Sequence, residues 1–273
     1  MSTEILRYAA FTDTPEGGNP AGVVLDASGL DDAEMQAIAT DVGYSETAFV
    51  TAADGTDMTV RYFSPLAEVP FCGHATIATG VAWGERNGDG VLRMTTPAGL
   101  VEVSVADGVA TLTSVAPSSA PLEDGDLDEL LAALGWSRDD LDPALPPRVG
   151  YAGAHHPVLG VAASERLASL DYDFERLGAL MAARDWTTVQ LVFREGADRF
   201  RSRNPFPPGG VVEDPATGAA AAAFGGYLRE LGLVTPPATV TIDQGIELGR
   251  PSLLTVRIPV DGGISVSGTA VPI

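Results

Sequence analysis

Three titratable side chains stand in short motifs. Glu46 is the candidate for proton transfer, whereas His74 taken alone is better interpreted as a capping or core histidine, and Asp214 could be only a helix cap. Glu46 lies in S-E-T-A-F-V, His74 in C-G-H-A-T and Asp214 in E-D-P-A-T-G. Moving a hydrogen on a carbon next to an unsaturated or amino-bearing centre needs one group to remove a proton and the same or another group to return it. A glutamate held in a partly dry environment has a raised pKa and can do both near neutral pH. The apolar neighbours of Glu46 favour such a role, although a strand-end glutamate is ordinarily exposed.

The stretch Gly209–Leu231 predicts a loop followed by an alanine-rich helix. Asp214 and Pro215 are typical of a helix start, with an acceptor side chain at the cap and a proline in the first turn. The run Ala219–Ala223 leaves little polar surface, so the helix is expected to be enclosed on several sides. Its free N–H groups and positive dipole end suit a small anion such as a carboxylate. An ordinary capped core helix explains the stretch equally well.

The same arrangement occurs twice in the chain. R-Y-F-S-P at 61–65 precedes a loop with Glu68 and a small-residue helix that opens with Cys72–Thr76. R-F-R-S-R-N-P at 199–205 precedes a loop with Glu213 and the alanine-rich helix. Each half therefore reads as a strand, a proline loop, a polar helix start and a helix of small residues that lets strands approach closely.

Two helix-centred halves indicate two similar domains. A connector rich in Pro, Ser and Asp over 115–126 is the best candidate for the boundary. We expect an N-terminal domain over residues 1–116, which a C-terminal strand within 262–273 could complete, and a C-terminal domain over 117–261. Small-ligand sites tend to lie between domains, so both helix starts are expected to face one interdomain cleft.

The remaining elements are those of an α+β protein. Alternating and β-branched residues predict strands over the ranges 5–11, 23–25, 47–51, 58–64, 92–95, 100–105, 109–115, 188–193, 199–203, 239–243, 253–258 and 264–268. Helices are expected from 31 or 32 to about 40, from 72 to about 85, over 127–134 and over 174–183. The segment 148–160 is expected to be irregular before a strand over 158–162.

Composition restricts the class of partner. The chain has 273 residues and a net charge of −21, and all of its basic residues are arginines. So acidic a protein is not expected to bind nucleic acid or anionic membrane surfaces. It has no apolar run of membrane-spanning length, its first residues lack the features of a signal peptide, and one cysteine rules out an internal disulfide. We therefore expect a cytoplasmic protein that acts on a small molecule.

Metal and cofactor sites are not expected. His155 and His156 are adjacent, and neighbouring side chains on an extended segment point in opposite directions, so they cannot easily share one ion. Cys72 is interpreted as a small buried packing residue. No phosphate-binding glycine loop with a following lysine, no G-x-S-x-G elbow and no dinucleotide fingerprint is present in the sequence.

Four motifs together carry a family resemblance. They are G-N-P-A-G-V at 18–23, S-E-T-A-F-V at 45–50, C-G-H-A-T at 72–76 and E-D-P-A-T-G at 213–218. In this order, and over nearly the whole chain, they resemble the PhzF-like family of phenazine biosynthesis.

The resemblance implies the diaminopimelate epimerase-like fold, in which two similar α+β domains each wrap a curled sheet around a central helix and the active site lies between them. It implies a cofactor-independent isomerase, active on trans-2,3-dihydro-3-hydroxyanthranilate in the characterised members, and a homodimer. Glu46 would be the acid/base, and His74 and Asp214 would line the site and assist. The substrate-binding positions implied are Asn19, Gly73, Thr217, Gly218 and Ala219.

One position departs from the family pattern. A serine often follows E-D-P-A-T-G, whereas this chain has Ala219 and so lacks one hydroxyl. Sites built around a hydrogen bond discriminate strongly when the partner is missing, so the departure bears on the choice of substrate more than on proton transfer. Two alternatives stay open: an epimerase or racemase of another amino-acid-like substrate that uses Glu46, and a small-molecule-binding relative without turnover.

Overall fold

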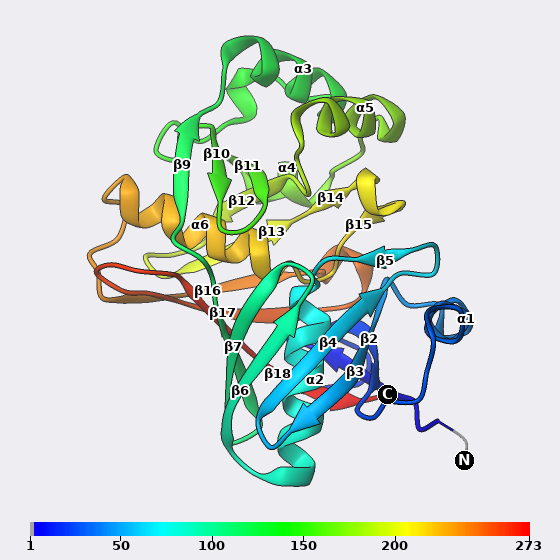
Figure 1. Ribbon diagram of the computed structural model, residues 1–273. Helices are drawn as coiled ribbons and strands as arrows, with labels where there is room; N and C mark the ends of the chain where they lie inside the picture. The colour runs from blue at the N-terminus through cyan, green and yellow to red at the C-terminus, as the bar shows by residue number, and fades with distance from the viewer. Residues whose placement is uncertain (1–2) are drawn as a thin grey trace. The chain divides into compact units, whose positions relative to one another are not determined.

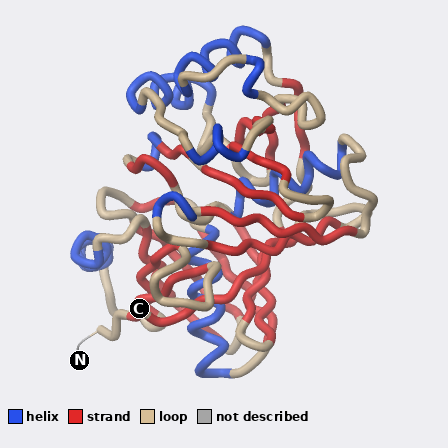
Figure 2. Tube along the Cα trace, turned by 180° about the vertical axis from the view of Figure 1, so that it is seen from behind, coloured by secondary structure: helices blue, strands red, loops and turns tan. Residues whose placement is uncertain are grey.

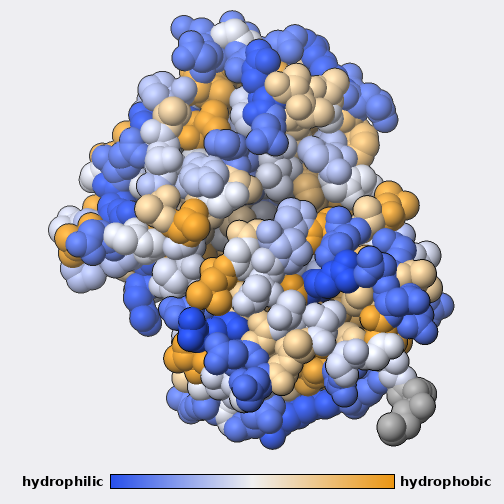
Figure 3. Space-filling view, viewed as in Figure 1, coloured by the Kyte–Doolittle hydropathy of each residue, from blue (hydrophilic) through white to orange (hydrophobic). Residues whose placement is uncertain are grey.

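The computed structural model describes residues 3–273, which form two compact α+β units. The first unit contains the residues up to Thr113 together with Ser267–Ile273, and the second contains Ser114–Val266. In each unit strands curl around a helix, as Figures 1 and 2 show. Hydrophilic side chains cover most of the face seen in Figure 3, with apolar ones in scattered groups. Among the described residues, no helix is long and apolar enough to span a membrane.

The sheet of the first unit closes on itself as a barrel. Its strands are β1 (Leu6–Ala10), β2 (Asn19–Val24), β3 (Glu46–Asp54), β4 (Asp57–Phe63), β6 (Gly90–Thr96), β7 (Gly99–Ala106), β8 (Val109–Thr113) and β18 (Ser265–Pro272), in this spatial order. The circle closes because β1 also pairs with β18, with Ala9 opposite Val271. The short strand β5 (Glu68–Val69) adds to β4.

Helix α2 (Gly73–Asn87) packs against β1, β2, β3, β7 and β8, and residues 74–82 of it are buried. Helix α1 (Asp32–Val42) packs on β3 and β4, where Met35 lies in one apolar cluster with Phe49 and Phe63. Its start follows the expected chemistry: the Asp31 carboxylate accepts from the N–H of Glu34, and the Glu34 carboxylate accepts from the N–H of Asp31. The closed barrel thus has α2 as its core.

The second unit is built on an open curled sheet. Its strands, in spatial order, are β9 (Ser118–Pro121), β10 (Arg148–Tyr151), β11 (His155–Gly160), β12 (Gln190–Arg194), β13 (Arg199–Arg203), β16 (Ala238–Gln244) and β17 (Ser252–Ile258). Strands β14 (Pro205–Phe206) and β15 (Val211–Glu213) form a separate small sheet. Helix α6 (Gly218–Glu230) packs against β9, β10, β11, β12 and β17.

Further helices cover the second unit. They are α3 (Asp124–Leu134), α4 (Ser164–Ala168) and α5 (Phe174–Arg184), with single 3₁₀ turns at Arg138–Asp140, Pro207–Gly209 and Ile246–Leu248. Leucines of α3 and α5 form an apolar cluster with Trp136, Trp186 and Leu191. This cluster gives the second unit a hydrophobic core of its own besides the surroundings of α6.

The strand pairing shows that the two units repeat one topology. The sequence β2–β3–β4–β6–β7 pairs as parallel, antiparallel, parallel and antiparallel, and β11–β12–β13–β16–β17 pairs in the same way. The central helix follows the third strand of each set, by way of β5 in the first unit and of β14 and β15 in the second. The weak sequence repeat therefore reflects a structural one.

Close approach of the sheet to each central helix depends on a glycine at the same position. Gly80 and Gly225 each lie seven residues after the first helical residue, Gly73 and Gly218. A Cβ on Gly80 would lie 3.1 Å from Val103, and a Cβ on Gly225 would lie 2.8 Å from Ile264 and 2.9 Å from Val256. A larger side chain at either glycine would force the sheet away from the helix, because close-packed interiors have no room to absorb it.

Two expectations about elements were wrong, and two elements were not expected. Segment 148–160 is a hairpin of β10 and β11, with Gly153 in the left-handed region at its turn. Asp214 and Pro215 do not start the alanine-rich helix, because the N-cap is Thr217 and α6 begins at Gly218. The connector contains strand β9, and helix α4 was not expected at all. In each case pairing or packing with distant residues sets the conformation.

Burial of His156 makes stability depend on pH. Its side chain is fully buried, its Nδ1 lies 2.9 Å from Oγ1 of Thr188, and burial lowers its pKa to about 4. The unfolded state, in which histidine titrates near 6.5, therefore binds more protons between these values. The free energy of unfolding should be highest above about pH 6.5 and should fall by roughly 3 kcal/mol toward pH 4, at about 1.36 kcal/mol per pH unit.

The variant His156→Asn tests this assignment by urea unfolding between pH 4 and 8. The amide keeps a polar group near Thr188 and cannot titrate, so the loss of stability with acid should become smaller in the variant than in the wild type. The control is the same substitution at the neighbouring exposed histidine, His155→Asn, since the side chain of His155 is 45% exposed. If both variants lose stability with acid as steeply as the wild type does, His156 is not the group responsible.

Candidate active site

Glu46 is the first residue of β3, at the end of the strand that faces the loop after α1. Strand β3 runs parallel to β2, and Glu46 is in register with Ala21. The polypeptide enters β3 from the left-handed Gly43, which ends α1. Side chains alternate along a strand, and the next residue, Thr47, is fully buried. Packing of Thr47 inside the barrel therefore fixes the position of Glu46 at the first residue of β3.

Cys72 and His74 belong to the start of α2. Cys72 is the N-cap residue, with extended backbone and no side-chain capping bond, and His74 is the second helical residue. The Thr76 hydroxyl donates to the Cys72 carbonyl at 2.7 Å and lies 2.7 Å from the hydroxyl of Tyr62 on β4. Burial raises the pKa of Tyr62, so its hydroxyl stays protonated and available as a donor. These bonds fix the first turn of α2 against the barrel wall.

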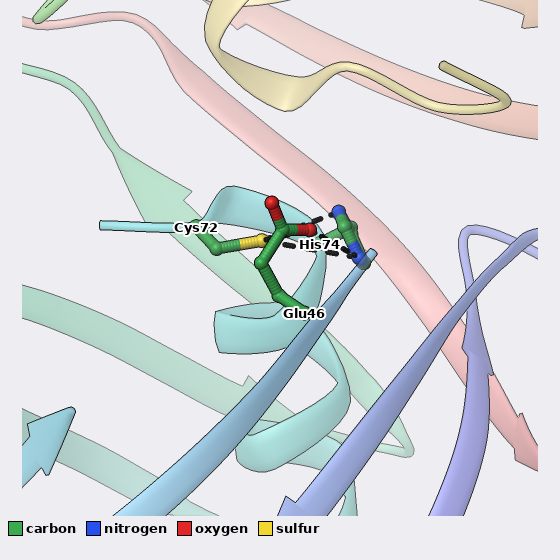
Figure 4. A group of neighbouring side chains, drawn as sticks. All are labelled: Glu46, Cys72 and His74. Atoms are coloured by element: carbon green, nitrogen blue, oxygen red, sulfur yellow. Dashed lines mark hydrogen bonds and ion pairs between the residues drawn. The ribbon is translucent and has the colours of Figure 1, made fainter. Parts of the chain in front are cut away.

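The side chains of Glu46, Cys72 and His74 point toward one another (Figure 4). The Cys72 thiol lies 3.4 Å from Oε2 of Glu46 and 3.3 Å from Nδ1 of His74, and Nε2 of His74 lies 3.5 Å from the same carboxylate oxygen. The Ser45 hydroxyl lies 3.4 Å from Nε2 of His74. The Glu46 side chain is 15% exposed and that of His74 is 6% exposed, so both groups are largely shielded from solvent.

Cys72 is buried, as expected, and its position adds polar neighbours that the sequence did not predict. Its sulfur is a polar neighbour of both groups that the sequence assigns to proton transfer. The sequence feature that could have indicated this contact is Cys-x-His at a helix start. The first turn of α2 brings both side chains to Glu46. A carboxylate, an imidazole and a thiol in mutual contact can share and relay protons, which is the chemistry of general acid/base sites.

In the second unit, Asp214 and Thr217 form a buried polar group with Gln244 of β16. The Thr217 hydroxyl donates to Oδ2 of Asp214 at 2.6 Å, and the Gln244 amide donates to the carbonyl of Asp214 at 2.7 Å. Oε1 of Gln244 in turn accepts from the N–H of Thr217 at 3.2 Å. Asp214 is thus hydrogen-bonded to Thr217, the N-cap residue of α6.

The remaining predicted residues lie at the ends of the same elements. Asn19 is buried at the start of β2, and Gly73 and Gly218 are the first residues of their helices. Ala219 follows Gly218 and is half-buried. The structure thus brings Glu46 and His74 together in the first unit, and Asp214, Thr217 and Gly218 together in the second. The expected cleft between the domains stays a prediction.

The topological repeat identifies positions that sequence reasoning missed. When the repeated motifs are aligned at their prolines, Pro65 and Pro205, Phe63 corresponds to Arg203. Phe63 pairs with Thr47 and Arg203 pairs with Leu191, so the preceding residues, Glu46 and Gln190, are counterparts. The aligned helix starts make Thr217 the counterpart of Cys72, and Ala219 that of His74. The acid, thiol and imidazole of the first unit therefore correspond to an amide, a hydroxyl and a methyl group in the second.

Comparison with known proteins shows the family of the chain. The family model described as phenazine biosynthesis-like protein, PhzC-PhzF, matches residues 8–273. The chain belongs to this family. Members of the family similar to the chain include a protein of Bacillus subtilis named uncharacterized isomerase YfhB, 34% identical over 285 residues, 98% of this chain and 96% of the relative. Trans-2,3-dihydro-3-hydroxyanthranilate isomerase of Pseudomonas fluorescens is 34% identical over 255 residues, 91% and 87% of the two chains.

Solved structures agree with the family assignment. The crystal structure of a PhzF-family phenazine biosynthesis protein of Bacillus anthracis covers 100% of this chain and 98% of its own, with 28% identity and a TM-score of 0.88. A probable proline racemase from Agrobacterium radiobacter shares the fold at 14% identity and a TM-score of 0.66, covering 100% of this chain and 91% of its own. The expected diaminopimelate epimerase-like fold is confirmed, and the relatives named for an activity make the chain an isomerase of this family.

A buried ion pair holds the E-D-P-A-T-G loop to the sheet. The Arg203 guanidinium donates to both carboxylate oxygens of Glu213, and it also donates at 3.0 Å to the carbonyls of Leu167 and Ala168. The side chains of Arg203 and Glu213 are only 8% and 4% exposed. Removing one partner of such a pair leaves an uncompensated buried charge.

We expect Glu213→Gln to lower the free energy of unfolding by about 3 kcal/mol, the scale for breaking a buried pair. The matched control is Glu68→Gln, which breaks the analogous but solvated pair with Arg61 ahead of α2 and should cost less than about 1 kcal/mol. Urea unfolding of both variants measures the difference. Equal losses would show that burial of the Arg203 pair does not control the stability of this loop.

Proposed function

We propose that the protein is a cofactor-independent isomerase that moves a proton within a small, carboxylate-bearing substrate resembling dihydro-hydroxyanthranilate. The observation that carries the proposal is the contact of the largely buried Glu46 carboxylate with Cys72 and His74. The Glu46 carboxylate would take a proton from a substrate C–H bond, whose electrons enter the conjugated system, and would return the proton to another carbon. His74 would hold the carboxylate and stabilise charge as it develops.

The substrate class has two supports. The relative from Pseudomonas fluorescens is named for the isomerisation of trans-2,3-dihydro-3-hydroxyanthranilate. Backbone N–H groups at the start of α2 and of α6, beside Gly73 and Gly218, are suited to a carboxylate, and neither helix has an acidic residue in its first turn. A contribution of Asp214 to catalysis is part of the proposal, and its hydrogen bond from Thr217 sets its orientation.

The counterparts of Glu46, Cys72 and His74 supply no second base, which leaves Asp214 as the titratable group next to the start of α6. Racemisation by two bases needs one titratable group for each face of the substrate. In the second unit the positions of Glu46, Cys72 and His74 hold Gln190, Thr217 and Ala219, none of which ionises near neutral pH. A reaction in which one carboxyl removes and returns the proton fits this asymmetry, whether the product is an isomer or an epimer.

Glu46→Gln should fold as the wild type does and lose at least about 10²-fold in rate, the usual contribution of a general acid/base. Proton NMR in deuterated water, with dihydro-hydroxyanthranilate, related amino acids and cyclic dienoic acids as candidates, follows isomerisation and deuterium uptake. Glu102→Gln, an exposed glutamate on β7, is the matched control. Unchanged turnover of the Glu46 variant would refute the proposed role.

The same experiment separates the alternative functions. Deuterium entering a stereocentre, with both configurations recovered, would identify an epimerase or racemase that uses Glu46. Ligand binding without exchange in the wild type would identify a binding protein. Isomerisation of a dihydro-hydroxyanthranilate by the wild type alone would support the proposal in full.

Ala219→Ser tests the substrate class at the position that departs from the family pattern. The residue is half-buried in the first turn of α6, next to the Asp214–Thr217 pair. If the substrate is hydroxyanthranilate-like, the added hydroxyl should raise kcat/KM for it roughly fivefold, the effect of a hydrogen bond of about 1 kcal/mol. Ala183→Ser on the exposed face of α5 is the control. A lower kcat/KM for this substrate would show that the site prefers another compound.

A further inference from the structure

Glu46, Cys72 and His74 form a set of potential metal ligands. One carboxylate oxygen, one sulfur and one imidazole nitrogen lie within 4.8 Å of one another, and within residues 3–273 no other group of three or more such side chains is as close. Cys72 and His74 are buried and Glu46 is mostly buried. The cluster therefore differs from the acidic groups of a protein surface, because it combines three types of ligand in a shielded position.

The separations between the ligand atoms suit zinc. Bond lengths of about 2.3 Å to sulfur and about 2.0–2.2 Å to nitrogen and oxygen place the ligand atoms of a tetrahedral site about 3.4–3.6 Å apart. Here the sulfur lies 3.4 Å from Oε2 of Glu46 and 3.8 Å from Nε2 of His74, and that nitrogen lies 3.5 Å from Oε2. Rotation of the imidazole about its Cβ–Cγ bond, a soft torsion, would turn a ring nitrogen toward the ion.

The ligand types select the metal. Thiolate and imidazole favour zinc over magnesium or calcium, which take oxygen ligands. A thiolate and a carboxylate together neutralise a doubly charged ion. The start of α2 disfavours a cation electrostatically, but helix N-termini also stabilise the thiolate form of cysteine, and Cys72 is the N-cap residue. The three side chains leave the fourth tetrahedral position to water or substrate.

We propose that Glu46, Cys72 and His74 bind Zn²⁺ and that the bound ion inhibits the enzyme. Inhibition rests on the proposed function, because the metal would occupy the carboxylate oxygen and imidazole that move and stabilise the proton. Metal binding itself does not depend on that function. The proposal departs from the sequence-based expectation of no metal, which rested on the pair His155 and His156. These two histidines do point apart, since His155 is exposed and His156 is fully buried on the opposite face of β11.

Binding is tested on the full chain without substrate. We expect Zn²⁺ to bind the wild type with one-to-one stoichiometry in calorimetry, and Co²⁺ to give the intense thiolate-to-metal charge-transfer absorption of a cysteine ligand. Cys72 is the only cysteine, so that absorption reports on this site alone. Cys72→Ser should abolish it and weaken Zn²⁺ binding at least about 100-fold, more than the loss of an outer-shell partner costs.

Two further variants keep the result interpretable. Glu46→Gln retains the thiol and should keep the cobalt absorption but bind more weakly than the wild type, which tests the site without relying on the folding of the Cys72 variant. His155→Ala removes an exposed histidine elsewhere and should bind as the wild type does. Absence of the cobalt absorption in the wild type, or Zn²⁺ affinity unchanged in both the Cys72 and Glu46 variants, would overturn the proposal.

Activity measurements separate this inference from the proposed function. Zn²⁺ should inhibit deuterium exchange by the wild type in proportion to the occupancy measured by calorimetry, and a chelator should restore it. Glu46-dependent exchange that Zn²⁺ does not affect would overturn the inhibitory site and leave the proposed function standing. Cobalt absorption with full activity in Glu46→Gln would refute the proposed function and leave the metal site standing.

Discussion

Enclosure of a helix by a curled sheet is the constraint on which the rest of each unit depends. The strands approach so closely that Gly80 and Gly225, at the same distance from the two helix starts, have no room for a side chain. The middle of each helix is therefore committed to packing, and its first turn offers free N–H groups for polar chemistry. This explains why the functional motifs C-G-H-A-T and E-D-P-A-T-G both lie at helix starts.

The two units share this architecture but not its chemistry. At equivalent positions the first unit has Glu46, Cys72 and His74, and the second has Gln190, Thr217 and Ala219. The second unit instead stabilises the turn before its helix with neutral hydrogen bonds from Gln244 and with a buried ion pair. At these equivalent positions the duplicated fold thus carries a carboxyl, a thiol and an imidazole in the first unit only, and the titratable group next to the start of α6 is Asp214.

The sequence predicted the α+β class, the two helix-centred halves and the elements that carry Glu46, His74 and Asp214, because these follow from local patterns and short motifs. The burial of Cys72 was predicted, but its contact with Glu46 was not, since the neighbours of a cysteine at a helix start are unknown until the position of β3 is known. The hairpin over 148–160 was missed because Gly150 and Pro157 interrupt the alternation, which pairing with neighbouring strands overrides. The equivalence of Glu46 and Gln190 depends on strand register, which no local pattern contains.

The net negative charge of the chain opposes the binding of an anionic substrate. With a net charge of −21, the long-range field repels a carboxylate substrate of the proposed kind. At physiological ionic strength this repulsion is screened beyond about 8 Å, so short-range groups decide binding. Helix N-termini supply such groups without adding a side chain, and their effect falls off within the first turn. A chain without lysine can therefore bind an anion through the backbone N–H groups of a helix start, such as those beside Gly73 or Gly218.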